Sequence, residues 1–253
     1  MAAESHPGHL IPIHNAFREG VYLKKGEETK QEILTVAERL FCQNGFDATS
    51  VNDILSVIHG SKGGFYHHFP SKDAVLQTIC QNKADLKAQR TRDMLGRMRR
   101  DDVVRRINFI FQSASPLCME DADFLAMLLP LLGRTDGLGV RVTYQEALQK
   151  AFSPILTEEI YHGTDLGVLY PACTDLAYPL LNLYSSCWME VCLLLVAALE
   201  EKHIVEASQV QSVLVRYRKV VEHLLDAPYG SILLVNLDTW EDLAERLTRP
   251  KGY

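Results

Sequence analysis

The sequence lacks the short motifs that mark most enzymes and zinc proteins. It has no GxSxG nucleophile motif and no phosphate-binding P-loop. His67 and His68 have no acidic residue at metalloenzyme spacing, and Asp121 and Asp123 suit the start of a helix better than a catalytic pair. No CxxC pair and no cysteine–histidine zinc spacing occurs among the cysteines, which are Cys42, Cys80, Cys118, Cys173, Cys187 and Cys192. We therefore expect no enzyme activity, no catalytic residues, no metal and no cofactor.

A secretory leader, an internal repeat and a low-complexity segment are also missing, and the apolar residues near position 10 are too few to span a membrane. We expect a cytoplasmic protein with no membrane partner. Its cysteines are then reduced and act as small apolar core residues. A redox-sensing role for Cys187 or Cys192 is the less favoured alternative.

An excess of positive charge is missing as well. The chain has 26 Lys and Arg against 32 Asp and Glu, a formal net charge of −6. This balance argues against a protein that coats nucleic acid without specificity. It does not exclude DNA docking through one local face, because the salt-dependent affinity follows the number of phosphates contacted. With 253 residues, 47% of them hydrophobic, the chain can bury a large core.

Two short helices joined by a tight turn are predicted between Thr49 and Lys72. Thr49 or Ser50 caps the first helix, and Asp53, three residues after Ser50, completes a capping box. Gly60 is expected to take the left-handed conformation that ends this helix. Its apolar residues recur at helical spacing and form one buried stripe: Val51, Ile54, Leu55 and Ile58.

The second helix is predicted from Lys62 to Phe69, with Ser61 as its cap and Pro70 closing it. Only Phe65 and Phe69 are available for burial. The side chains left facing outward are Lys62, Tyr66, His67 and His68. A short helix that buries little and offers many hydrogen-bond donors is typical of a recognition helix.

This pattern resembles the helix-turn-helix of the tetracycline-repressor-like (TetR) family of bacterial transcription regulators. The matching segments are F-x-x-T-S-V-x-D-I from Phe46 to Ile54, S-K-G-x-F-Y-x-H-F from Ser61 to Phe69, and P-S-K-D-A-V-L from Pro70 to Leu76. The resemblance covers residues 27–87, and the remainder is similar only in architecture. His59 departs from the family pattern, which usually has a small residue before the turn glycine. We expect the turn to tolerate it.

Two kinds of DNA contact are expected from this motif. The first turn of the first helix offers free N–H groups to a phosphate, and the family resemblance implies that Tyr66 and Lys72 grip flanking phosphates. Lys62 can bond guanine, His67 can reach base edges, and the adjacent glycines let the backbone approach the groove. The candidate DNA-binding residues are Thr49, Ser50, Ser61, Lys62, Gly63, Gly64, Tyr66, His67 and Lys72.

The whole chain is predicted to be all-α. We expect a disordered tail over residues 1–26, a three-helix helix-turn-helix domain over 27–87, and a larger helical domain for effector binding and dimerisation over 88–253. A long helix from Ser71 to about Arg100 joins the two domains. The basic stretch 83–106 could be a second DNA patch, but we favour a solvated linker helix laced with salt bridges.

Long helices at 174–201 and 207–225 are apolar over much of their girth and must be buried, either within their own domain or against a second copy. We favour a dimer in which they form a four-helix bundle. A separate segment, 103–188, is rich in aromatic residues and has predicted kinks at Pro130 and Pro154. It could enclose an effector pocket, and the alternative is an ordinary solid core. The candidate pocket residues are Phe111, Met127, Tyr144, Phe152, Asn182 and Tyr184.

The sequence therefore predicts a transcriptional regulator, most simply a repressor. It would bind a palindromic operator in double-stranded DNA as a homodimer and be released by a small, largely apolar or aromatic effector. The alternative is an all-helical ligand-binding or interaction protein whose helix-turn-helix no longer binds DNA.

Overall fold

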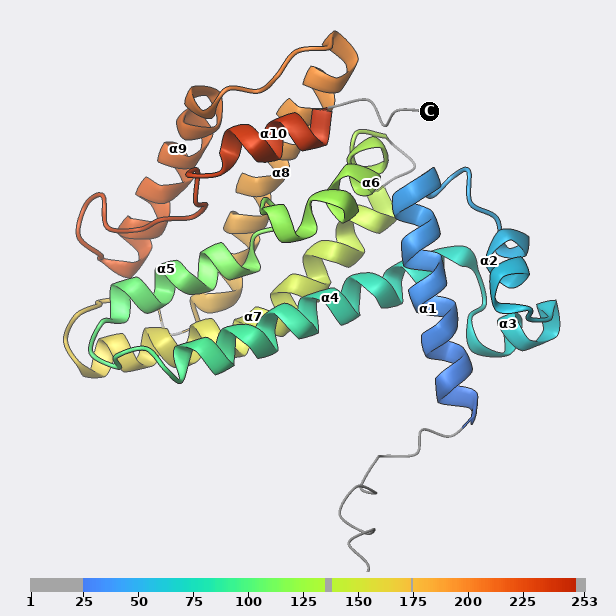
Figure 1. The fold of residues 1–253 in the computed structure, drawn as a ribbon. Helices are drawn as coiled ribbons and strands as arrows, with labels where there is room; N and C mark the ends of the chain where they lie inside the picture. Colours follow the sequence, from blue (N-terminus) through green and yellow to red (C-terminus); the bar gives the residue numbers. More distant parts are fainter. Residues whose placement is uncertain (1–24, 135–137, 174, 249–253) are drawn as a thin grey trace, which may run out of the picture.

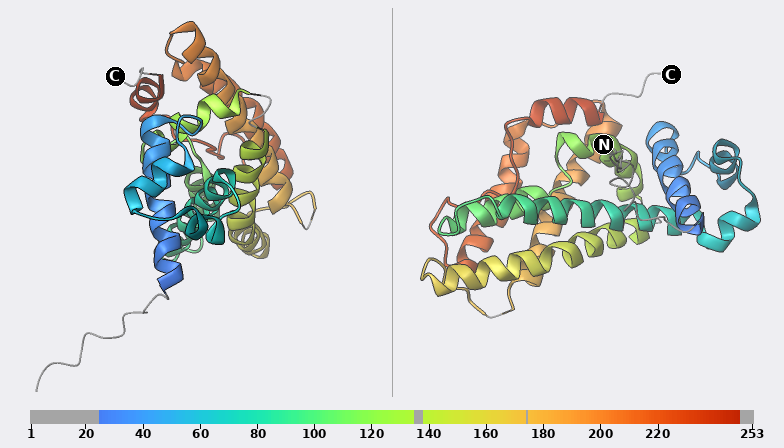
Figure 2. Two further views of the ribbon diagram at one scale, coloured as in Figure 1. Left: turned by 90° about the vertical axis from the view of Figure 1, so that its right-hand side faces the viewer. Right: turned by 60° about the horizontal axis from the view of Figure 1, so that its bottom comes forward.

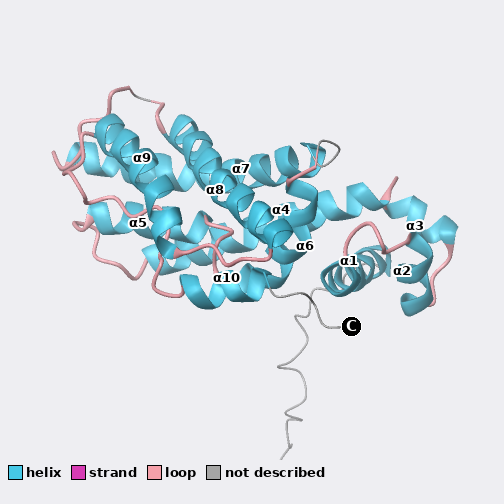
Figure 3. Ribbon diagram, turned by 90° about the horizontal axis from the view of Figure 1, so that it is seen from above, coloured by secondary structure: helices cyan, strands magenta, loops and turns pink. Residues whose placement is uncertain are grey.

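The structure is a computed structural model that describes residues 25–134, 138–173 and 175–248. Every regular element in those ranges is a helix (Figure 3), so the predicted all-α class is confirmed. Of the expected tail, residues 1–24 lie outside the described residues, and Lys25 and Gly26 already belong to the first helix.

The N-terminal unit contains α1 (Lys25–Asn44), α2 (Val51–Ile58) and α3 (Lys62–His68). These helices lie together at one end of the molecule (Figure 1). Their apolar faces meet in a small core in which the rings of Phe41 and Phe46 lie 5.0 Å apart, edge to face. The other buried members of this core include Ile33, Ala37, Ile54, Phe65, Phe69, Val75 and Leu76.

Helix α4 (Lys72–Leu95) leaves this unit and continues into the rest of the molecule (Figure 2). Its first turns pack on α1, whereas its later turns pack on α5 (Val103–Ala114) and α7 (Leu138–Asp165). The helix ends at Leu95, earlier than the predicted end near residue 100. The predicted domain limit at residue 87 therefore falls inside a continuous helix, which gives a direct mechanical connection between the two regions.

The larger region is built from the remaining helices. After α5 come a 3-10 turn, η1 (Met119–Asp121), then α6 (Ala122–Leu132) and α7. Helices α8 (Ala177–Glu201) and α9 (Ala207–Leu225) follow, and α10 (Trp240–Thr248) lies against α6 and α8. Pro130 and Pro154 were predicted to interrupt or kink their helices, yet α6 and α7 each continue through their proline.

Buried polar pairs fasten this region over long sequence distances. Arg106 and Glu159 are each 2% exposed, and the Arg106 guanidinium donates through Nε to a Glu159 carboxylate oxygen at 2.7 Å. It also donates to the Leu95 carbonyl at 2.6 Å, which ties the end of α4 to α5 and α7. The pair satisfies two charges that burial would otherwise penalise heavily.

The C-terminal segment is held in the same way. The Asn108 amide donates to the Ser231 carbonyl at 2.8 Å and its oxygen accepts from Leu233 N at 2.9 Å. The indole Nε1 of Trp240 donates to the Val205 carbonyl at 2.8 Å. These bonds explain how a chain segment with little periodicity is laid on the helical body.

Helix α8 is long and apolar enough to cross a membrane, with a mean hydropathy of 1.6 over its most apolar window. Within the protein, 56% of that window is buried. Its composition therefore also fits a core helix, which is its place in this fold.

Candidate DNA-binding site and effector region

The helix-turn-helix is set up by side-chain caps at three helix starts. Ser50 accepts a hydrogen bond from Asp53 N at 3.2 Å, and the Asp53 carboxylate accepts from Ser50 N at 2.7 Å. These bonds lower the pKa of the Asp53 carboxyl, with the Ser50 hydroxyl as the largest cause. Ser61 and Ser71 cap α3 and α4 with bonds of 3.1 Å from the backbone N–H three residues later. Each cap satisfies an N–H that the helix cannot bond itself.

The turn between α2 and α3 differs from its prediction in one respect. His59, and not Gly60, takes the left-handed conformation, with φ of 51°. Gly60 is needed for space instead, because a Cβ there would stand 3.0 Å from side-chain atoms of Leu55 and Ile58. His59, the residue that departs from the family pattern, therefore takes the left-handed conformation. Histidine is among the non-glycine residues found most often in it.

Helix α3 has one buried and one open face. Phe65 is 1% exposed and Phe69, which ends the helix, is 3% exposed, so both anchor α3 to the core. The opposite face is open to solvent, with Tyr66 55% exposed. A Cβ added to Gly63 would have no atom within 4 Å. The structure thus brings together on one exposed surface Ser61, Lys62, Gly63, Gly64, Tyr66 and His67.

Thr49 and Lys72 are placed differently from that surface. Thr49 is fully buried, and its hydroxyl donates to the Gly45 carbonyl at 2.8 Å. The Lys72 ammonium donates to the carbonyls of Phe46 and Thr49 at 2.7 and 2.9 Å and lies 4.2 Å from the centre of the Phe46 ring. Both residues hold the turn before α2, and Lys72 retains one N–H for any outside partner.

Comparison with known families identifies this motif. The family model described as "Bacterial regulatory proteins, tetR family" matches residues 33–79, which span α1 to the first turns of α4. Residues 33–79 therefore carry a TetR-type helix-turn-helix. The match covers the capped helices and the exposed α3 face described above, so the family resemblance of the sequence is confirmed.

Curated transcriptional regulators match part of this chain. The chain is 30% identical over 106 residues to the uncharacterized HTH-type transcriptional regulator YerO of Bacillus subtilis. The matched residues make up 40% of this chain and 35% of YerO. The chain is 43% identical over 50 residues to the HTH-type transcriptional regulator QacR of Staphylococcus aureus, 20% of this chain and 27% of QacR. The matches therefore span about a third or less of those relatives.

Solved structures show that the fold similarity extends beyond the motif. The TetR-family repressor FadR of Thermus thermophilus, in complex with lauroyl-CoA, superposes with a TM-score of 0.55 at 21% identity, covering 79% of this chain and all of FadR. RolR in complex with resorcinol gives a TM-score of 0.51 at 14% identity over 90% of this chain and 97% of RolR. At these identities the likeness concerns the fold alone.

The predicted effector residues mostly lie in the interior of the larger region. Asn182 is exposed, although its side chain accepts from Gln149 at 3.1 Å. Pockets of about 290 to 390 Å³ lie elsewhere between helices, and none of these has a predicted effector residue in its lining. The predicted residues that are buried, each 4% exposed or less, are Phe111, Met127, Tyr144, Phe152 and Tyr184.

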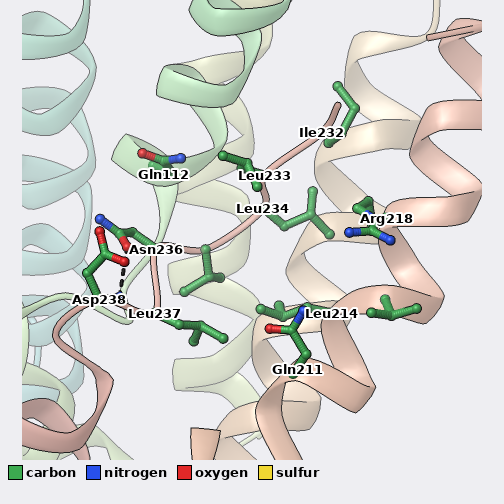
Figure 4. Close-up of a pocket in the computed structure, with 12 residues that line it drawn as sticks. Gln112, Gln211, Leu214, Arg218, Ile232, Leu233, Leu234, Asn236, Leu237 and Asp238 are labelled. Carbon is green, nitrogen blue, oxygen red and sulfur yellow. Dashed lines mark hydrogen bonds between the residues drawn. The ribbon is translucent and has the colours of Figure 1, made fainter. Parts of the chain in front are cut away.

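One of these pockets, of about 300 Å³, lies between α9 and the C-terminal segment 232–238 (Figure 4). Leu214 and Arg218 of α9 face Gln112 of α5 and the leucines of the segment across it. Leu214 is 8% exposed, so its own chain covers it. The apolar stripe of α9 is therefore partly used inside the protomer.

A charged cluster at the junction of the two regions was not predicted from the sequence. Asp121 of η1 is 6% exposed and forms an ion pair with Lys87 of α4. Lys83, also on α4, lies 4.0 Å from Asp121 and 2.8 Å from Glu38 of α1. The Lys87 ammonium also donates to the Ser115 carbonyl at 2.6 Å. The basic stretch 83–106 thus supplies internal connections at Lys83, Lys87 and Arg106, because α4 happens to run between α1 and η1.

Proposed function

We propose that this TetR-family chain is a DNA-binding transcriptional repressor that binds a palindromic operator as a homodimer and is released by a small effector. The observation that supports it most directly is the exposed face of α3. It presents Lys62, Tyr66 and His67 beside two glycines on a helix fixed by a cap at one end and by buried phenylalanines on its back. A rigid helix with a polar face and little side-chain bulk suits the major groove.

Within this proposal Lys62 and His67 read base edges, while Tyr66 and the first turn of α2 contact phosphates. The Ser50 hydroxyl and the Asp53 carboxylate already bond each other, so the α2 contact comes mainly from backbone N–H groups. Lys72 acts first by holding the turn before α2, and its remaining N–H can contact a phosphate. Base contacts give sequence preference, whereas phosphate contacts give affinity and salt dependence.

Selection from randomised duplex DNA tests this function. The expected product is a two-fold symmetric site whose half-sites lie about 34–36 Å apart, or a multiple of that spacing, as a two-fold dimer requires. Mobility shift on the recovered site then measures affinity. Recovery of no preferred sequence would favour the alternative, a helical binding protein whose helix-turn-helix has lost DNA binding.

Dimerisation is assigned to the outward faces of α8 and α9. Leu193 of α8 is 44% exposed and Val220 of α9 is 45% exposed, and the Arg216–Glu190 ion pair holds the two helices together. Two such helices from each protomer can form a four-helix bundle. Leu214 points to its own C-terminal segment and is not part of the proposed surface.

A charge placed on that face tests the assignment. Leu193→Glu should give folded monomers that bind the operator weakly, whereas Val142→Glu on α7, at a site 39% exposed, should remain dimeric. Sedimentation measures both variants. A dimeric Leu193→Glu protein would place the dimer surface elsewhere.

Effector release is supported by the connection through α4. Lys83 and Lys87 of α4 contact Asp121 of η1 in the larger region, and Lys83 also pairs with Glu38 of α1 in the DNA-binding unit. A shift of η1 would therefore move both α4 and α1. Related folds hold small molecules, lauroyl-CoA in FadR and resorcinol in RolR. An effector acts only through its different affinities for the two states, and a coupling of about 1–3 kcal/mol is usual.

A further inference from the structure

Six buried side-chain polar atoms in the larger region have no hydrogen-bond partner among the described residues, and three of them are donors on α7 and α8. These donors are the hydroxyls of Tyr144 and Tyr184 and the indole Nε1 of Trp188. Each side chain is 2% exposed or less. A buried donor without an acceptor is destabilising, and native proteins keep few of them. Three such donors on the packed helices α7 and α8 are available to bond an acceptor on a ligand.

These groups belong to one aromatic cluster. The rings of Tyr144 and Trp188 lie 6.0 Å apart, Tyr144 meets Phe124 at 5.9 Å, and Tyr184 meets Phe111 at 5.3 Å. Tyr144 comes from α7, whereas Tyr184 and Trp188 are one helical turn apart on α8. The donors are therefore contributed by two facing helices, surrounded by apolar rings.

The segment 115–121 forms a wall next to this cluster. The Ser115 hydroxyl is close enough to Tyr184 to lower its pKa against the larger effect of burial, but it does not meet Tyr184 in hydrogen-bond geometry. It accepts instead from Leu117 N at 3.1 Å. Cys118 and Glu120 of the same segment also line a pocket of about 310 Å³ between α4 and α5.

The charges near the cluster are already neutralised. Asp121, the carboxylate that acts on Tyr144, is paired with Lys87. Lys83, whose ammonium lies 4.7 Å from the centre of the Phe124 ring, is paired with Glu38. Burial raises the pKa of both tyrosines well above the usual value, so they stay protonated and remain donors at neutral pH. A guest at this place meets hydrogen-bond donors and aromatic faces but no free charge, and a charged guest would lose its hydration without compensation.

We propose that Tyr144, Tyr184 and Trp188 form the polar end of the effector site, and that it takes an uncharged, mainly aromatic compound with a carbonyl or similar acceptor oxygen. The compound enters from the α4–α5 pocket by displacing the 115–121 wall. Lys87 bonds this wall to α4 through Ser115 and Asp121, so occupancy pulls on the helix that leads to the DNA-binding unit. This inference rests on the proposed effector-released repressor and names its ligand class.

Acetophenone and isopropylbenzene are suitable probes, because they have the same number of non-hydrogen atoms and only acetophenone has an acceptor oxygen. Acetophenone should bind the full-length protein about 10-fold more tightly by calorimetry, the ratio that one net hydrogen bond supplies. Benzoate, of similar size but charged, should bind more weakly than acetophenone.

The protein contains two tryptophans, which provide an internal control. In a proton–nitrogen NMR spectrum acetophenone should move the indole N–H signal of Trp188 downfield. The signal of Trp240, whose Nε1 is already bonded to the Val205 carbonyl, should stay in place. Trp188→Phe and Trp240→Phe assign the two signals.

Tyr144→Phe and Tyr184→Phe should reduce the acetophenone-to-isopropylbenzene ratio towards one, while Tyr161→Phe, at a 47% exposed site, should leave it unchanged. The inference is overturned if neither probe binds, if both bind equally, or if the Trp188 signal does not respond. Binding of both probes without any effect on operator affinity would keep the ligand site but reject its role as effector site. Loss of operator binding in the unliganded protein would reject the proposed function alone.

Discussion

The two ends of this molecule satisfy their polar groups in different ways. In the DNA-binding unit the caps at Ser50, Ser61 and Ser71 all reach a backbone N–H three residues away. In the larger region the buried bonds join residues far apart in the sequence. Arg106 and Glu159 are separated by 53 residues and Asn108 and Ser231 by 123.

This difference matches the proposed tasks of the two ends. Local caps let α2 and α3 keep their shape while one face stays exposed for DNA. Long-range bonds hold α4, α5 and α7 as a unit, yet the same region leaves donors of Tyr144, Tyr184 and Trp188 unpaired. Helix α4 thus joins a rigid DNA-binding unit to a region whose unpaired donors can bond a ligand.

The largest expected effect comes from breaking the long-range pair in the larger region. Glu159→Gln leaves the Arg106 charge buried without its carboxylate and should lower the free energy of unfolding by about 3–5 kcal/mol. Urea unfolding measures it. Asp101→Asn removes the partner of Arg99 in an exposed pair, and should lower the stability far less because solvent screens that pair. Equal losses in both variants would contradict the role given to the buried pair.

Lys72→Ala tests a long-range polar contact within the DNA-binding unit. It removes charge-assisted bonds to two carbonyls 23 and 26 residues away and should destabilise the protein by about 1.5–3 kcal/mol. Operator and random duplex should both bind more weakly, by the same factor. A salt slope reduced by about one unit would show an additional phosphate contact, and an unchanged slope would leave Lys72 as a positioning residue alone.

Lys62→Ala sharpens the contrast, because Lys62 is exposed and has no structural bond to lose in the described part of the chain. Stability should be unchanged. Preference at one base pair of each half-site should relax by about 1–3 kcal/mol, measured by competition between operator variants. Equal weakening on operator and random DNA would make Lys62 a phosphate contact.

Ser50→Ala removes a local cap and should cost about 1 kcal/mol of stability, measured by thermal or urea unfolding. The Ser50 hydroxyl also lowers the pKa of Asp53. The folded-state pKa of Asp53 is thus below its unfolded value, so its stabilisation is present at neutral pH and is lost as the pH falls through that lowered pKa. This acid dependence should weaken in Ser50→Ala and persist in Ser56→Ala on the exposed side of α2.

Gly63→Ala should give the smallest effect on stability, and with the opposite sign. The new methyl meets open space and replaces a poor helix former, so unfolding should become harder by about 0.5–1 kcal/mol. Operator affinity should nevertheless fall, since the methyl stands on the face proposed to enter the groove. Gly64→Ala is the comparison, because its methyl would stand 3.3 Å from the capping Ser61 oxygen. Unchanged operator affinity for Gly63→Ala would remove that position from the interface.

The motif was largely predictable because its signals are local. Helix starts, the buried Phe65 and Phe69 and the open face of α3 follow from residue spacing within a few turns. The exception is the turn itself: Gly60 was predicted to be left-handed, and His59 holds that conformation instead. Both residues can adopt it, and Gly60 is needed for a different reason, because Leu55 and Ile58 leave no room for a Cβ there.

The sequence by itself determined the all-α class, the family and the helices of the helix-turn-helix, since caps and apolar periodicity act between residues less than two turns apart. Only the tertiary structure decided which donors find acceptors. It turned the Thr49 hydroxyl inward, directed Lys72 to the turn before α2, and placed Asp121 between Lys83 and Lys87. It also brought the unpaired donors of α7 and α8 together. Those outcomes depend on the docking of helices distant in the chain, and no local pattern encodes the angle or register of that docking.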